Sequence, residues 1–187
     1  MHPLAQRLHD DHRRLTQVLD VLEAQIDRVA RAEDADLDLM LEAMTYITDF
    51  PNRLHHPVED VLFKCLAAID PASADLCQEQ IAEHERLFHD SAALYGLLEA
   101  IQLDEAMAPR DHLVHAGQEF VAAQRAHLLR EEHDLLPRAQ LRLGSAQWDI
   151  AAQTASAVSD PLDGTATPAR YQSLYQTICT PHQGAPD

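Results

Sequence analysis

Glycine is scarce in this sequence, with only five residues in 187. Alanine, leucine, glutamate, glutamine and arginine, all good helix formers, are abundant instead. This composition predicts an all-α protein. The length favours one domain, with room for an appendage, and is sufficient to bury a sizeable core.

Basic residues are also few. Fourteen lysines and arginines stand against 31 aspartates and glutamates, and the formal net charge is -17. An excess of negative charge makes duplex DNA, RNA and anionic membrane surfaces unfavourable partners. No apolar run is long enough to span a membrane, and the polar start "MHPLAQRLHDDH" does not resemble a signal peptide. We therefore expect neither a nucleic acid nor a membrane as partner.

Cysteine is limited to Cys65, Cys77 and Cys179, an odd number without a CxxC motif. This pattern predicts reduced thiols in a cytoplasmic protein. The simplest interpretation of Cys65 and Cys77 is that they are small buried hydrophobes.

Four long helices are predicted, over residues 3–32, 37–69, 71–103 and 109–141. Each has apolar residues at alternating spacings of three and four, the pattern of a helix that packs along one seam. Because the connections are short, sequential helices should be antiparallel neighbours. The expected fold is an up-down-up-down antiparallel four-helix bundle over residues 1–143. Residues 144–187, the C-terminal segment, are expected to add a fifth helix and a short sixth one, capped by Thr167 with Pro168 at its first position. This segment could cover the bundle or mediate association into a homodimer.

Histidine is the outlier, with 12 residues, and four histidines interrupt the apolar seams. His12 lies 22 residues before residue 34 and His55 lies 21 after it; His84 lies 22 before residue 106 and His127 lies 21 after it. In antiparallel helices that rise about 1.5 Å per residue, these counts predict one common height. Each helix should therefore deliver one histidine to the same layer of the core.

Two of these histidines are followed by a glutamate four residues later, in the pairs His55/Glu59 and His127/Glu131. This spacing places both side chains on one helix face. A lone helical histidine is usually an ordinary partly buried residue, and a single HxxxE is usually a surface pair. Two pairs and two single histidines at one height favour a metal site instead. Histidine and glutamate together suit iron, manganese or zinc, and six donors favour two ions bridged by Glu59 and Glu131.

The constellation resembles the hemerythrin-like, or HHE cation-binding, domain. The matching segments are "LHDDHRRL", "LHHPVEDVLF", "AEHERLFHD" and "RAHLLREEHDLLP", which lie within residues 4 to 140. The resemblance implies a four-helix bundle that holds two non-haem iron ions, with bridging carboxylates and a coordination position open to a small molecule such as O2 or NO. The metal ligands that it implies are His12, His55, Glu59, His84, His127 and Glu131.

The third helix departs from the oxygen-carrying hemerythrins, which have a second histidine four residues after the first. Phe88 occupies that position here, and His89 lies about 140° around the helix from His84. The expected set is four histidines and two glutamates, which leaves one iron less saturated and allows zinc or manganese in place of iron.

The segment "RLHHPVEDVLF" contains two adjacent histidines before a proline. A helical rotation of about 100° per residue assigns His55 to the seam and His56 to a flank. Pro57 lacks an N–H for the carbonyl of Arg53, so we expect the second helix to be distorted where it meets the metal. His9 is expected to be a bystander, with an outer partner or a spare ligand as the alternatives, and Asp60 and Glu132 are expected to be surface acids or outer partners of the imidazoles. The histidines away from the layer are expected to be solvated (His112, His115 and His133).

Two classes of function remain open. The first is a protein that binds O2 or NO, or holds iron, for sensing, storage or protection. The second is an enzyme that reduces peroxide or NO at the same centre, and a zinc-stabilised structural bundle is a further alternative. The sequence slightly favours binding, because no acid–base group or substrate pocket is evident and Leu62 and Phe88 make the surroundings apolar.

Overall fold

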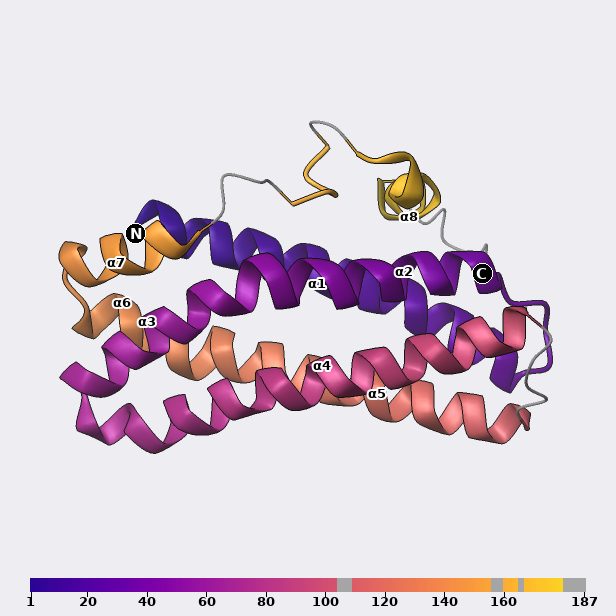
Figure 1. Cartoon of the computed structure of the whole chain (residues 1–187), viewed down its shortest axis with the longest axis horizontal. Coiled ribbons are helices and arrows are strands. Elements are labelled where there is room, and N and C mark those ends of the chain that lie inside the picture. The colour runs from indigo at the N-terminus through magenta and orange to yellow at the C-terminus, as the bar shows by residue number, and fades with distance from the viewer. Residues whose placement is uncertain (104–108, 156–159, 165–166, 180–187) are drawn as a thin grey trace, which may run out of the picture.

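The computed structural model describes residues 1–103, 109–155, 160–164 and 167–179. These residues are helical, without strands, and the long helices lie side by side in a bundle (Figure 1). The helices of the bundle are α1 (Pro3–Ala30), α2 (Leu37–Phe50), α3 (His56–Ile69), α4 (Ala74–Gln102), α5 (Arg110–Arg130) and α6 (Leu136–Arg142). Short elements complete the fold: the 3-10 turns η2 (Pro71–Ser73) and η4 (Ala169–Tyr171), and the helices α7 (Ser145–Thr154) and α8 (Gln172–Cys179).

The predicted helix boundaries agree closely with this description. The second predicted helix is split into α2 and α3 by one π-helical turn, η1 (Pro51–His55), and the fourth into α5 and α6 by another, η3 (Glu131–Leu135). The predicted distortion of the second helix is therefore confirmed. The second π turn was not predicted from the sequence.

Both π turns precede a proline by the same interval. The N–H of His56, just before Pro57, bonds the carbonyl of Pro51, and the N–H of Leu136, just before Pro137, bonds that of Glu131. Proline has no N–H to donate, and in a regular helix its ring crowds the carbonyl four residues earlier. A π turn accommodates both effects by widening the helix, and such turns are frequent at functional sites.

The core consists of two apolar clusters. One includes Leu15, Leu19, Met44, Phe50 and Phe120, and the other Leu4, Leu8, Leu62, Phe63 and Leu136. On α1, the buried side chains between the two clusters are polar, because Asp11 and His12 lie between Leu8 and Leu15. The bundle therefore has a buried polar layer between two apolar regions.

The C-terminal segment packs back on the bundle. Helix α7 contacts α3, and Trp148 stacks on His2 with ring centroids 5.5 Å apart. Helix α8 contacts α1 and α2 (Figure 1). The predicted cap at Thr167 is wrong, because its hydroxyl has no hydrogen-bond partner and α8 begins at Gln172, after a 3-10 turn. Among the described residues, no helix combines the length and hydrophobicity that crossing a membrane requires.

Candidate metal centre

The first group of possible ligands comprises His12, His55, Glu59 and Glu131, and each residue is at most 2% exposed. Helices α1 and α3 and the two π turns supply them. The Nε2 atoms of His12 and His55 lie 2.9 Å apart, and Glu59 places Oε1 3.1 Å from the first and Oε2 3.2 Å from the second. One donor atom from each residue falls within 4.8 Å of the others.

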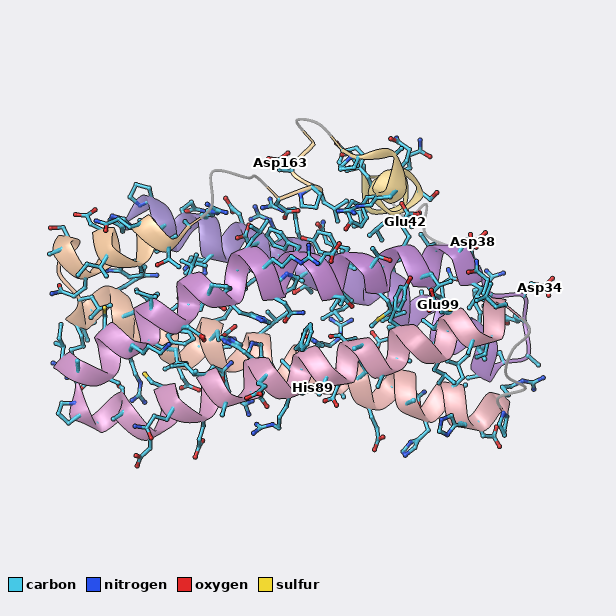
Figure 2. The ribbon with its side chains drawn as sticks, viewed as in Figure 1. Asp34, Asp38, Glu42, His89, Glu99 and Asp163 are labelled. Carbon is cyan, nitrogen blue, oxygen red and sulfur yellow. The ribbon has the colours of Figure 1, made fainter. Side chains whose placement is uncertain are left out.

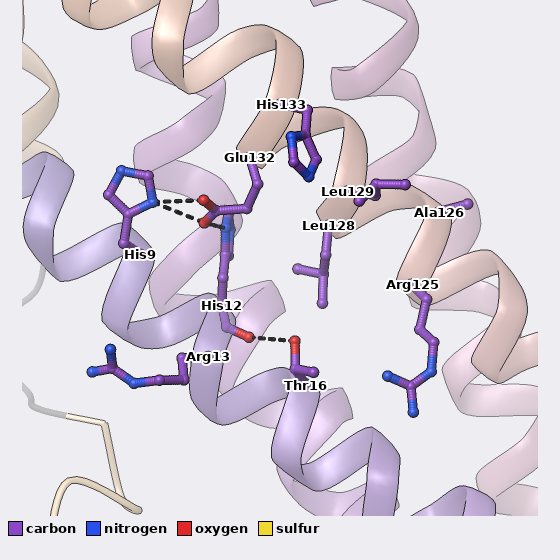
Figure 3. Close-up of a pocket in the computed structure, with 10 residues that line it drawn as sticks. All are labelled: His9, His12, Arg13, Thr16, Arg125, Ala126, Leu128, Leu129, Glu132 and His133. Carbon is purple, nitrogen blue, oxygen red and sulfur yellow. Dashed lines mark hydrogen bonds and ion pairs between the residues drawn. The ribbon is translucent and has the colours of Figure 1, made fainter.

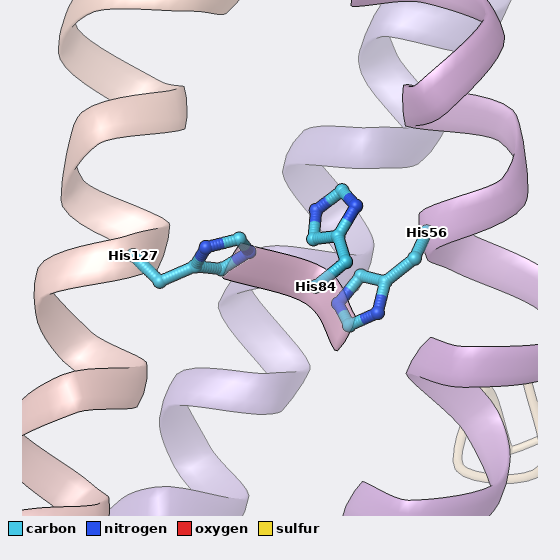
Figure 4. Close-up of side chains that lie close together, drawn as sticks. All are labelled: His56, His84 and His127. Carbon is cyan, nitrogen blue, oxygen red and sulfur yellow. The ribbon is translucent and has the colours of Figure 1, made fainter. Parts of the chain in front are cut away.

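The second group comprises His56, His84 and His127, from α3, α4 and α5 (Figure 4). The rings of His56 and His84 are stacked, with centroids 4.0 Å apart, and His127 meets His84 edge-on at 4.9 Å. All three residues are buried, and one nitrogen of each lies within 4.8 Å of the others. Nδ1 of His56 has no hydrogen-bond partner.

The two glutamates face both groups. Glu131 places Oε2 3.4 Å from Nε2 of His12 and Oε1 3.3 Å from Nε2 of both His84 and His127. Glu59 reaches His84 as well as the first group, with its Oε2 3.7 Å from Nε2. Neither Oε2 has a hydrogen-bond partner, although both residues are fully buried. Burial of an ionised carboxylate is expensive unless it is paired or binds metal, so this donor set fits a metal site.

Four of the five imidazoles contact a carboxylate through Nδ1, on the side away from the centre. The pairs are His12–Glu132 at 2.7 Å, His55–Asp11 at 3.3 Å, His84–Asp60 at 2.8 Å and His127–Glu83 at 3.2 Å. Such a contact fixes the ring, and once the imidazole is neutral it can keep the proton on Nδ1 and leave Nε2 to bind metal. Nδ1 of His127 also lies 2.7 Å from the side-chain amide nitrogen of Gln80. Asp60 and Glu132 are thus hydrogen-bond partners of clustered imidazoles, which is one of the two roles expected for them. Glu132 also bonds His9, so His9 contacts this acid and lies outside both groups.

The charges of the acids change the pKa values of the buried histidines. Burial lowers the pKa of His12, but its contacts with Glu132 and Glu59 outweigh burial and raise it to about 10. The same opposition raises the pKa of His84 to about 10 and that of His55 to about 9. His56 differs, because burial and the neighbouring histidines together hold its pKa well below the usual value. His56 is therefore neutral at pH 7.

The sequence of this chain matches a known family of cation-binding domains. Residues 4–139, well over half of the chain, match the family model described as hemerythrin HHE cation binding domain. The chain belongs to this hemerythrin family. No curated protein and no solved structure was found to match it.

The structure brings together all six residues predicted for this hemerythrin-like centre and adds a seventh, His56. The assignment of His56 to a flank is wrong, because it assumed a regular helix and η1 places a π turn immediately before this residue. Phe88, expected to help make the surroundings of the site apolar, is 43% exposed, and Leu87 is buried instead. His89 is exposed on α4, as expected (Figure 2). The fifth clustered histidine, His56, thus lies on α3, which is part of the second predicted helix. The oxygen-carrying hemerythrins have their additional histidine on the third helix of the bundle.

Two surface pockets reach the centre. One, of about 600 Å³, lies between α1 and α5 and is lined by His12, Glu132, Thr16, Leu128 and Leu129, among others (Figure 3). The other, of about 620 Å³, is lined by His56, His84, Thr48 and Phe88, among others. The first pocket borders the group that contains His12, and the second pocket borders the group that contains His56 and His84. Surface pockets thus border both groups, although no substrate pocket was evident from the sequence.

Proposed function

We propose that this hemerythrin-like protein holds two non-haem iron ions. His12 and His55 would bind one ion, His56, His84 and His127 the other, and Glu59 and Glu131 both. The observation that carries the proposal is the pair of buried carboxylates between two histidine groups. The proposed frame is the up-down-up-down antiparallel bundle of residues 1–143, with residues 144–187 as an extension. The free cysteines fit the cytoplasm as its location.

The donor types fit iron, and manganese or zinc takes the same donors. Iron bound in this way supplies reversible coordination of a small molecule such as O2 or NO, and one-electron redox change. With both glutamates shared, the ion held by His12 and His55 would have four protein donors, and the ion held by His56, His84 and His127 would have five. The ion with fewer donors borders the pocket in Figure 3, and its lower donor number makes this the side where we expect the small molecule.

The surrounding residues have two roles in this proposal. Asp11, Asp60, Glu83 and Glu132 orient the imidazoles through Nδ1. The apolar clusters on either side of the polar layer keep bulk water away, which slows proton delivery and favours reversible binding over turnover. The proposed role is thus to bind O2 or NO, or to hold iron, for sensing, storage or protection.

A spectroscopic test follows. The iron-loaded protein is exposed in turn to O2, azide and NO, and the proposal predicts a change in the visible spectrum with at least one of them. A spectrum indifferent to all three, together with tight zinc binding, would favour a structural zinc bundle. Steady turnover of peroxide or NO under reducing conditions would identify an enzyme instead.

A further inference from the structure

Asp160 is a buried acid in the C-terminal segment, outside the residues that match the family. One of its oxygens, Oδ2, accepts hydrogen bonds from the hydroxyl of Tyr46, at 3.0 Å, and from Nε of Arg14. The other, Oδ1, accepts the backbone N–H of Leu162 at 2.8 Å. Asp160 is 5% exposed, so these bonds join the segment to α1 and α2 away from bulk water.

The network continues from Arg14 into the metal centre. Its Nη2 donates to Oδ1 of Asp11 at 2.7 Å, and Oδ2 of Asp11 lies 3.3 Å from Nδ1 of His55. Asp11 and His55 are each 2% exposed. A continuous line of polar contacts therefore runs from Asp160 through Arg14 and Asp11 to His55.

The guanidinium of Arg14 is the shared element of this line. It contacts Asp160 through Nε and Asp11 through Nη2, so its rigid fork sets the two carboxylates relative to each other. The other contact of Asp11 with an arginine, Nε of Arg7 at 3.9 Å, is longer. Loss of the charge on Asp160 would weaken its bond with Nε of Arg14. The guanidinium would stay bonded to Asp11, but it would be held less firmly in position.

His55 is distinct among the five clustered histidines in this respect. The acids beside His12, His84 and His127 come from η3, α3 and α4 respectively, within the residues that match the family. Among the described residues, only the acid beside His55 is held in turn by the C-terminal segment.

We propose that Asp160 is a positioning residue for the metal centre, acting through Arg14 and Asp11 on the imidazole of His55. This inference rests on the proposed function. It gives the C-terminal segment a role in metal binding. Because coupling between two equilibria is reciprocal, metal binding should also strengthen the contact of Asp160 with Arg14.

The test titrates Fe(II) anaerobically into the full chain and into variants. Asp11→Asn should weaken one of the two binding steps by about 10–100-fold, as loss of an outer hydrogen-bond partner typically does. Asp160→Asn should weaken the same step by a smaller factor, and the double variant should bind no more weakly than Asp11→Asn alone. Arg14→Lys, which keeps the charge and loses the fork, should reproduce the effect of Asp160→Asn.

Two controls separate this role from general loosening. Leu174→Ala trims a fully buried side chain of α8 that has no part in the polar line, and should leave both steps unchanged. Asp60→Asn removes the partner of His84 and should weaken the other step. The proposal is overturned if Asp160→Asn binds both ions as wild type does, if its effect adds to that of Asp11→Asn, or if Leu174→Ala weakens the same step equally.

Two further readouts complete the test. In metal-free protein, the Nδ1–H proton of His55 should exchange slowly in wild type and faster in Asp160→Asn; equal rates would overturn the positioning role without reference to metal. In wild type, Fe(II) should slow hydrogen exchange at the Leu162 amide, and an unchanged rate would contradict the reciprocal coupling. A wild-type chain that binds no iron would overturn the proposed function itself, which is seen before any variant is compared.

Discussion

Replacement of His56 by phenylalanine should separate its role in packing from its role in metal binding. Phenylalanine keeps a ring beside His84, where the centroids now lie 4.0 Å apart, and removes both nitrogens. Because Nδ1 of His56 is buried without a partner, its removal should raise the stability of the metal-free chain by about 1 kcal/mol. The second ion would lose one of five protein donors, a larger change than the 10–100-fold loss of affinity, about 1.4–2.7 kcal/mol, that follows loss of an outer partner.

The assay combines calorimetric titration of Fe(II) with urea unfolding of the metal-free chain. His56→Phe should lose one binding step by more than about 100-fold, while its midpoint of unfolding does not fall. His89→Ala is the control, since His89 is exposed on α4 beside Phe88 and should change neither quantity. Two unchanged binding steps in His56→Phe would refute the assignment of His56 as a ligand and return it to the flanking role that a regular helix predicts.

Three further outcomes are expected. His12, His55 and His84 have raised pKa values and must lose their protons to bind metal, so metal affinity should rise from pH 7 towards pH 9. Calorimetry in buffers of different ionisation enthalpy should detect up to three protons released at pH 7, and a metal affinity independent of pH would contradict this. Pro57→Ala restores an N–H for the carbonyl of Arg53 and should let a regular helix compete with η1, so iron titration should show weaker binding without a lower midpoint of thermal unfolding; unchanged affinity would mean that the proline does not maintain the π turn. Free metal at 100 times the dissociation constant should add about 2.7 kcal/mol of stability per site, seen as a rise in the thermal midpoint that a chelator reverses; no rise would indicate binding to the unfolded chain as well.

The helices and the height of the polar layer could be predicted because they depend on local spacing. Nearly equal counts of 22 and 21 residues on the two sides of each turn predicted that His12, His55, His84 and His127 lie in one layer, and the HxxxE spacing added Glu59 and Glu131 to it. These counts tolerate an error of one helical turn, and the π turns lie within that margin.

What could not be predicted depends on departures from regular geometry and on contacts distant in sequence. His56 was misplaced because the sequence reveals that Pro57 disturbs the helix without showing where the extra residue is accommodated. Phe88 was misplaced because the seam of α4 passes through Leu87. Asp160 is 146 residues from Arg14, and no local pattern marks it as a partner.

The central claim is that seven buried side chains of this hemerythrin-like protein hold two metal ions. Anaerobic titration of Fe(II) into metal-free protein, with elemental analysis of the product after desalting, measures this directly. The account predicts two iron ions per chain in wild type and a loss of bound iron in Glu59→Ala. A wild-type chain that retains no iron, or a Glu59→Ala variant that retains both ions, would contradict it.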